Sequence, residues 1–396
     1  MQTRSAALAA SFALASLLCL GPSAARAGPK LEIGDDSSLQ INYEMQLHAP
    51  WRDTGSGPDG TGDTVDVFFR RNRLTFIGQV TSRIGLVASI QHEGDRRIGD
   101  LTVYEQPARV FDVLDAYATA DVSEAFKLRA GLTKDQLVRE HNEGCFSSLS
   151  LDRSLFVYTA LPRVSRDFGV VAWGNALQSR FQYRVAAMKG NDDAADPASS
   201  LRYTGRAHVT LLDPESSLVY RGTYLGEKKV LTVGGGYQFE TDAVYGNVAA
   251  ATLAKTYRAW TVDGFAEYPL PAGTVTLSGA YLHADFDGAY QGGDPDPRST
   301  GFYGEKKGWY AKAGYLLPMK VATGQLQVFG RVERWNFAEL SGIVDQQVRW
   351  LGGGVNYYIQ GPKVRLTLEA SHDDFVKEDA TSRDFTTVTL MLQTLL

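Results

Sequence analysis

The side chains of this sequence that could do chemistry are chiefly arginines and lysines that recur at alternate positions. Arg71 and Arg73 form the first such pair, and Lys363 with Arg365 forms a later one. Side chains two apart in a β-strand lie on one face of the sheet, and the planar guanidinium of arginine can hold two oxygens of an oxyanion at once. The spacing therefore predicts strands that present rows of cations, suited to attracting or binding anions.

Other reactive side chains form no recognisable catalytic or metal-binding pattern. None of the six histidines belongs to a motif around a serine nucleophile, and Cys19 and Cys145 form no Cys-x-x-Cys-His haem motif. A formal net charge of −5 opposes binding to nucleic acid. We therefore expect a protein that is not an enzyme and that has no metal site, cofactor or nucleic-acid partner.

The strand that precedes these cations shows what kind of sheet must position them. Between Leu39 and His48, five large apolar side chains alternate with five polar ones, so one face suits lipid and the other suits water. Only a closed sheet can use both faces in a membrane. After residue 28 no stretch reaches the roughly 18 to 20 apolar residues of a spanning helix. The pattern predicts a transmembrane β-barrel in contact with outer-membrane lipid.

The first residues have the features of a secretory signal peptide. Arg4 precedes an apolar run at 6–20, and the small-residue triplet 25–27 would be cleaved before Gly28. The alternative is a transmembrane anchor, but the run is short for a spanning helix. We expect residues 1–27 to be removed and residues 28–396 to reach the bacterial outer membrane.

The alternating pattern predicts an all-β fold, a transmembrane antiparallel barrel of about 16 strands. Short links, expected as periplasmic turns, alternate with long links, expected as external loops, as in bacterial barrels. An additional strand between Asp213 and Lys229 would break this alternation, so we interpret that segment as a longer periplasmic connection. The predicted strands are 38–48, 65–80, 83–94, 110–121, 125–133, 166–175, 179–188, 201–212, 230–240, 256–268, 272–285, 306–317, 322–335, 346–359, 363–374 and 384–396.

If the apolar face of each strand meets lipid, its other face lines the lumen. The basic residues predicted to line the channel and bind anions are Arg71, Arg73, Lys127, Arg129, Arg184, Arg202, Arg206, Lys312, Arg331, Lys363 and Arg365. The inward acids are Glu44, Glu93, Asp115, Asp263, Glu267, Glu333 and Glu369. Cations outnumber acids on these faces, which predicts a basic lumen that raises the local concentration of anions.

The alternative is that the inward arginines pair with the acids and only complete a polar wall. Arg331 and Glu333, two apart on one strand face, are the expected pair. Arg71 and Arg73 have no acid within two positions on their own face. We therefore expect Arg71 and Arg73 to contribute most to anion preference.

The longest connection, 134–165, is the candidate constriction loop. Loops of more than ~15 residues without regular structure are usually functional, and this one carries four basic residues, Lys134, Arg139, Arg153 and Arg163. In sixteen-stranded outer-membrane barrels such a loop commonly folds inward. The alternative is a mobile external loop.

Several stretches, in order, resemble the phosphate-selective porin O and P family over nearly the whole chain. They are Phe69-Arg70-Arg71-Asn72-Arg73-Leu74, Asp115-Ala116-Tyr117, Arg129-Ala130-Gly131-Leu132-Thr133-Lys134, Arg166-Asp167-Phe168-Gly169-Val170, Tyr183 with Lys189-Gly190-Asn191, Tyr203-Thr204-Gly205-Arg206, and Gly352-Gly353-Gly354-Val355-Asn356-Tyr357-Tyr358. The resemblance implies a sixteen-stranded trimeric barrel for passive diffusion with anion preference.

Phosphate selectivity in that family depends on lumen arginines together with loop lysines. Only Lys134 represents the loop lysines in the candidate constriction here, so we expect a general or oxyanion porin. The alternative function is a barrel that acts as a scaffold or sheath for a partner protein, such as a periplasmic cytochrome in an electron conduit. Copurification of a haem protein would distinguish the two.

Overall fold

The computed structural model describes residues 28–92, 111–154, 157, 166–190, 197–198, 200–247, 250–286, 304–340, 343–378 and 382–396. The expected signal peptide at 1–27, the predicted lumen acid Glu93 and the predicted loop cation Arg163 lie outside the described residues. Among the described residues, no helix is long and apolar enough to cross a membrane.

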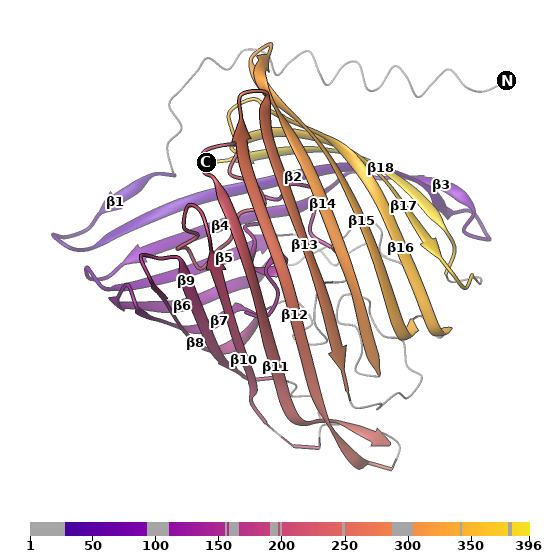
Figure 1. The fold of residues 1–396 in the computed structure, drawn as a ribbon, viewed down its shortest axis with the longest axis horizontal. Coiled ribbons are helices and arrows are strands. Elements are labelled where there is room, and N and C mark those ends of the chain that lie inside the picture. The colour runs from indigo at the N-terminus through magenta and orange to yellow at the C-terminus, as the bar shows by residue number, and fades with distance from the viewer. Residues whose placement is uncertain are drawn as a thin grey trace.

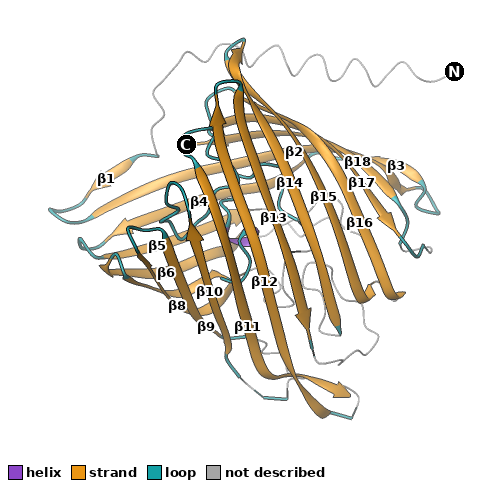
Figure 2. Ribbon diagram, viewed as in Figure 1, coloured by secondary structure: helices purple, strands orange, loops and turns teal. Residues whose placement is uncertain are grey.

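The described strands form a closed antiparallel barrel with 16 wall strands, which confirms the predicted fold (Figures 1 and 2). Each wall strand pairs with the next, and β18 pairs with β2 to close the sheet. Two short strands, β1 (Lys30–Glu32) and β3 (Gly62–Val65), pair with β2. The wall strands are β2 (Ser38–Ser56), β4 (Phe68–Gln79), β5 (Ile84–His92), β6 (Phe111–Ser123), β7 (Phe126–Lys134), β8 (Arg166–Ala176), β9 (Phe181–Met188), β10 (Arg202–Thr210), β11 (Val230–Asn247), β12 (Thr252–Leu270), β13 (Gly273–Asp285), β14 (Glu305–Val321), β15 (Gly324–Leu340), β16 (Ile343–Tyr358), β17 (Val364–Phe375) and β18 (Phe385–Leu395).

Three predicted loops are shorter than expected because the strands continue through them. The β11–β12 and β15–β16 hairpins occupy most of 241–255 and 336–345, and β2 continues to Ser56. A β-bulge between Glu240 and Val244 shifts the register of β11, which interrupts the alternation in the sequence. Beyond the lipid, moreover, outward side chains need not be apolar, so sequence alternation underestimates the length of a hairpin.

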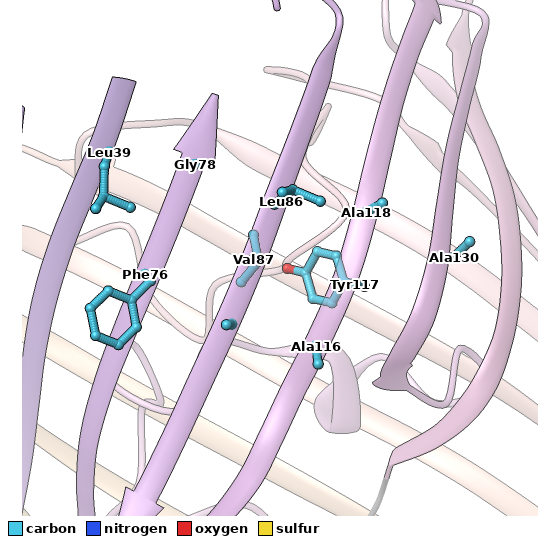
Figure 3. A pocket seen from close by; sticks show the side chains of 10 residues that line it. Leu39, Phe76, Gly78, Leu86, Val87, Ala116, Tyr117, Ala118 and Ala130 are labelled. Carbon is cyan, nitrogen blue, oxygen red and sulfur yellow. The ribbon is translucent and has the colours of Figure 1, made fainter. Parts of the chain in front are cut away.

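The outer face of the wall is apolar, as contact with lipid requires. Alternate residues of single strands, such as Leu231 and Val233 of β11, are exposed there. Over β4–β7 the outer face has an apolar depression lined by the large side chains of Phe76 and Leu86 and by the small residues Gly78 and Ala118 (Figure 3).

Part of the barrel interior is also apolar. Leu137, Val138 and Val157 of the candidate constriction loop join a buried cluster with wall residues such as Trp335 and Tyr257. This cluster attaches the loop to the β11–β18 side of the wall.

Candidate functional site

The described part of the candidate constriction loop, residues 135–154, lies inside the barrel. Wall residues from widely separated strands donate hydrogen bonds to its backbone, including Gln46 Nε2 to Cys145 O (3.3 Å), Arg365 Nη1 to Ser148 O (2.7 Å) and Arg206 Nη1 to Leu137 O (3.0 Å). The loop includes a short 3-10 helix, Glu140–Asn142, drawn in purple in Figure 2. Because β2, β10 and β17 all bind it, the loop crosses the lumen.

Two glycines of the wall leave room for loop side chains. A Cβ at Gly314 of β14 would lie 2.5 Å from Leu149 Cδ1, and one at Gly236 of β11 would lie 3.1 Å from Leu137 Cδ1. Both distances are shorter than ordinary carbon contacts. The glycines therefore form recesses that fix the position of the loop.

A β-bulge in β4 places two successive arginines in the lumen. Gln46 pairs with Arg71 and Leu47 pairs with Phe69, so Arg70 is an additional residue in β4. Both guanidinium groups contact Asp152 of the loop, with Arg70 Nε 2.6 Å from Oδ2 and Arg71 Nη2 2.8 Å from Oδ1. Strict alternation assigned Arg70 to the lipid face and missed it. The sequence contained a signal for the bulge, because placing Arg70, the neighbour of Phe69, on the lipid face would cost free energy.

Several predicted lumen cations form ion pairs with carboxylates. Arg206 makes a bidentate pair with Asp263 at 2.6 and 2.8 Å, and Arg202 Nε lies 3.0 Å from Glu240 Oε2. Lys312 pairs with Glu140 of the loop, and the expected pair of Arg331 with Glu333 is present. The positive charges of these residues are locally compensated.

Five other predicted cations have no carboxylate partner within the described part of the chain. Arg73 donates to Gln91 and to Cys145 Sγ, and Arg365 donates to Ser148 O and Gln393. Arg129 donates to Thr133, and Arg184 donates to Gln182 and Gln136. Lys134 donates to the carbonyl oxygens of His141 and Glu143. These residues leave uncompensated positive charge in the lumen.

The remaining predicted cations lie in other settings. Lys127 is paired with Glu124 at 2.7 Å, and Lys363 lies in the turn before β17. Arg153 Nη1 donates to His141 O at 2.6 Å. Arg139 makes a buried bidentate pair with Glu215, both contacts at 2.8 Å. Arg139 is therefore held by the connection after β10 and is not free to face a solute.

The positive field of the site acts on the loop thiol. Burial raises the pKa of Cys145, but the charges of Arg153, Arg71 and Arg73 outweigh burial and hold this pKa well below its usual range. The thiolate that these charges favour lies 3.4 Å from Arg73 Nη1 and offsets part of the positive charge around it. Within the described residues, no group of three or more His, Cys, Asp or Glu side chains could hold a metal ion.

Sequence reasoning missed the acids that come from the connections. Asp152, Glu140 and Glu215 neutralise wall or loop cations, whereas the strand acids Glu267 and Glu369 accept hydrogen bonds from the backbone N–H groups of Tyr224 and Leu151. Strand alternation identifies the inward face of a strand. It carries no information about which connection folds against that face.

Comparison with known proteins agrees with this geometry. The family model of phosphate-selective porin O and P matches residues 41–394. No curated protein has a sequence that matches this chain. Among solved structures, the fold is similar to that of the outer-membrane channel DcaP of Acinetobacter baumannii, with a TM-score of 0.59, 14% identity and coverage of 94% of this chain and 100% of that one.

Two further solved structures share the fold. OprB of Pseudomonas putida has a TM-score of 0.56 and 8% identity, covering 90% of this chain and 94% of that one. OmpT of Vibrio cholerae, an outer-membrane protein solved in a trimer form, has a TM-score of 0.50 and 11% identity, covering 91% of this chain and 100% of that one. Because the family match spans nearly the whole chain, this protein belongs to the phosphate-selective porin O and P family of outer-membrane channels.

Proposed function

We propose that this protein is a porin for passive diffusion of small solutes that prefers anions, inorganic oxyanions among them, and that residues 135–154 form its constriction. The observation that carries the proposal is the set of five lumen cations that have no carboxylate partner among the described residues, Arg73, Arg129, Lys134, Arg184 and Arg365. Charge fixed in a narrow space with low-dielectric walls raises the local concentration of the opposite ion. Salt weakens this effect over about 8 Å at physiological ionic strength.

The bulged pair in β4 supports a preference for oxyanions. Arg70 and Arg71 share the single carboxylate of Asp152, so the three groups together keep a net positive charge. A guanidinium can bind two oxygens of one anion. An oxyanion that competes with Asp152 would therefore bind two guanidinium groups whose orientation the bulge already fixes.

The position of the loop favours a diffusion channel over a sheath for a partner protein. Residues 135–154 bind β2, β10 and β17 across the lumen, and a threaded partner would need that space. We also infer a homotrimer, which the trimer form of OmpT supports. Chemical crosslinking in detergent tests the trimer, and a monomer as the largest crosslinked species would contradict it.

The proposal is tested with purified protein in planar bilayers by adding sulfate or phosphate to a chloride solution. We expect the oxyanion to reduce the single-channel chloride current in a concentration-dependent way. Neutralising the bulged pair in the variant Arg70→Gln/Arg71→Gln should weaken this block. A protein that forms no channels, or a chloride current that oxyanions leave unchanged, would contradict the proposed oxyanion porin.

A further inference from the structure

The connection between β10 and β11, residues 213–229, folds into the barrel. Leu218, Tyr220 and Thr223 are at most 5% exposed, whereas turns that join two strands normally lie on the surface. Tyr220 makes only an isolated bridge, to Glu143, so the strand-like segment 218–220 is not part of the wall. We call residues 213–229 the inner connection.

The inner connection lies against the inner face of one half of the wall. Tyr220 Oη is 2.8 Å from His208 Nδ1 and accepts a hydrogen bond from Arg206 Nε at 3.2 Å, both on β10. On β12, Glu267 Oε2 accepts hydrogen bonds from Thr223 Oγ1 (2.8 Å) and Tyr224 N (2.9 Å). On β8, Asn175 Nδ2 donates to Ser216 O at 2.9 Å.

The same connection is joined to the candidate constriction loop by backbone and side-chain bonds. Gly144 N donates to Tyr220 O (2.9 Å), Tyr220 N to Asn142 O (3.2 Å) and Gly222 N to Ser147 O (3.0 Å). The buried Arg139–Glu215 pair adds a charged contact, and the rings of Tyr220 and Phe265 lie 4.4 and 4.3 Å from the Arg139 guanidinium carbon. Two segments that enter from opposite ends of the barrel therefore form one unit inside it.

The two halves of the periplasmic side of the lumen differ in exposure as a result. Thr210 of β10 and Thr232 of β11 face inward, with their hydroxyls 3.1 Å apart, and each is 1% exposed. On the opposite side, Ile77 of β4 shares the inward register of Arg73 and is 38% exposed. The inner connection covers the first pair and leaves the second residue open.

We propose that the inner connection is a second pore-narrowing segment, which together with residues 135–154 closes the β8–β12 side of the lumen and confines solutes to the β4–β7 side. In this arrangement solutes pass Arg73 and Arg129, which have no carboxylate partner among the described residues. The Arg139–Glu215 pair acts as a positioning contact between the two segments. The inference rests on the proposed function, since it assigns the route within a conducting channel.

The test uses thiol accessibility in the full mature chain. Cys145 is the one free cysteine of the described residues, so Cys145→Ser serves as the background for single cysteines in Ile77→Cys and Thr210→Cys. With a negatively charged methanethiosulfonate, the thiolate forms a mixed disulfide and displaces the sulfinate. We expect Ile77→Cys to be labelled and to lose most of its current, and Thr210→Cys to keep both its mass and its current.

Equal labelling at the two positions, or no labelling at Ile77→Cys, would overturn the assigned route. Labelling is read as a mass shift in detergent as well as by current. A correctly labelled protein that does not conduct would therefore refute the proposed function and leave the placement of the inner connection standing.

A second pair of variants tests the positioning contact. Adding Glu215→Gln to Thr210→Cys should make that cysteine reactive and raise the single-channel conductance. The matched control is Glu227→Gln, which removes the exposed Arg221–Glu227 pair (3.4 Å) of the same connection and should leave Thr210→Cys unlabelled. An unreactive Thr210→Cys in folded Glu215→Gln protein would show that this pair does not hold the segments together.

Discussion

At the scale of single residues, the type of partner decides what each lumen cation contributes. Arg129 bonds a neutral hydroxyl and Arg73 bonds Gln91 and Cys145 Sγ, whereas Arg206 is neutralised by the carboxylate of Asp263. A unit charge seen from ~10 Å at an effective dielectric constant of about 20 contributes about 1.7 kcal/mol before salt screening. Arg73→Gln and Arg129→Gln should therefore each lower the anion-to-cation permeability ratio several-fold at low salt.

Bilayer recordings of permeability ratios check this prediction. The matched control is Lys307→Gln, which removes the same charge at a position that is 46% exposed and paired with Glu305 outside the lumen. It should leave the ratio unchanged. The prediction fails if Lys307→Gln changes selectivity as much as Arg73→Gln does.

One loop carboxyl should make selectivity depend on pH. Burial raises the pKa of Glu143 to about 7 against the opposing charge of Lys312, and the neighbouring Glu140 carboxylate adds to the rise. Below that pKa Glu143 is neutral and the lumen loses a negative charge, so anion preference should be stronger at pH 6 than at pH 8. Recordings of Glu143→Gln at both pH values should show this difference removed, and an undiminished pH response in that variant would assign the effect to another group.

At the scale of elements, the joined loop and inner connection depend on the buried Arg139–Glu215 pair. Removing Glu215 leaves buried Arg139 with only the more distant carboxylate of Glu143, 4.0 Å from its Nε, and breaking a buried ion pair typically costs about 3–5 kcal/mol. Glu215→Gln should thus lower the denaturant concentration at which half of the barrel is unfolded. Arg139→Met/Glu215→Met should recover part of that loss, because neither charge remains buried.

The exposed Arg221–Glu227 pair of the inner connection is the control for the buried Arg139–Glu215 pair. Surface ion pairs contribute roughly 0–1 kcal/mol, so Glu227→Gln should have a small effect on the same midpoint. Equal losses in Glu227→Gln and Glu215→Gln would remove the buried pair from its assigned role.

The glycine recesses are a second test at this scale. In Gly314→Val the new side chain would occupy the space of Leu149, displacing the loop or destabilising the barrel by the roughly 1–3 kcal/mol typical of overpacking. Shortening the loop residue in Gly314→Val/Leu149→Ala should restore conductance and stability. Gly205→Ala is the control, since a Cβ at Gly205 would meet no atom within 4 Å, and a loss there as large as in Gly314→Val would exclude a specific recess.

The wall strands could be predicted because a strand between lipid and water must alternate along its length. Leu39 to His48 and the later strands obey this rule, and their number and order are confirmed. Elements that depart from it could not be read correctly. The bulge at Arg70 turns one residue inward, and the β11–β12 hairpin continues past the lipid, where alternation is no longer required.

At the scale of the whole molecule, the closed wall and the two segments inside its lumen, residues 135–154 and the inner connection, are determined by different interactions. Closure follows from the requirement that every backbone N–H and C=O in lipid be paired within the sheet. The placement of the segments inside the lumen depends on contacts between residues far apart in the sequence, such as Arg71 with Asp152 and Arg139 with Glu215. No local pattern in either segment specifies its partner, so the cations could be predicted to face inward but their neutralisation could not.

The central claim is that uncompensated cations make the lumen select anions. It is tested most directly by the zero-current potential of the purified wild-type protein in a planar bilayer across a KCl gradient. We predict that the dilute side becomes negative, because chloride crosses faster than potassium. A positive dilute side, which indicates a cation-selective channel, would contradict the account.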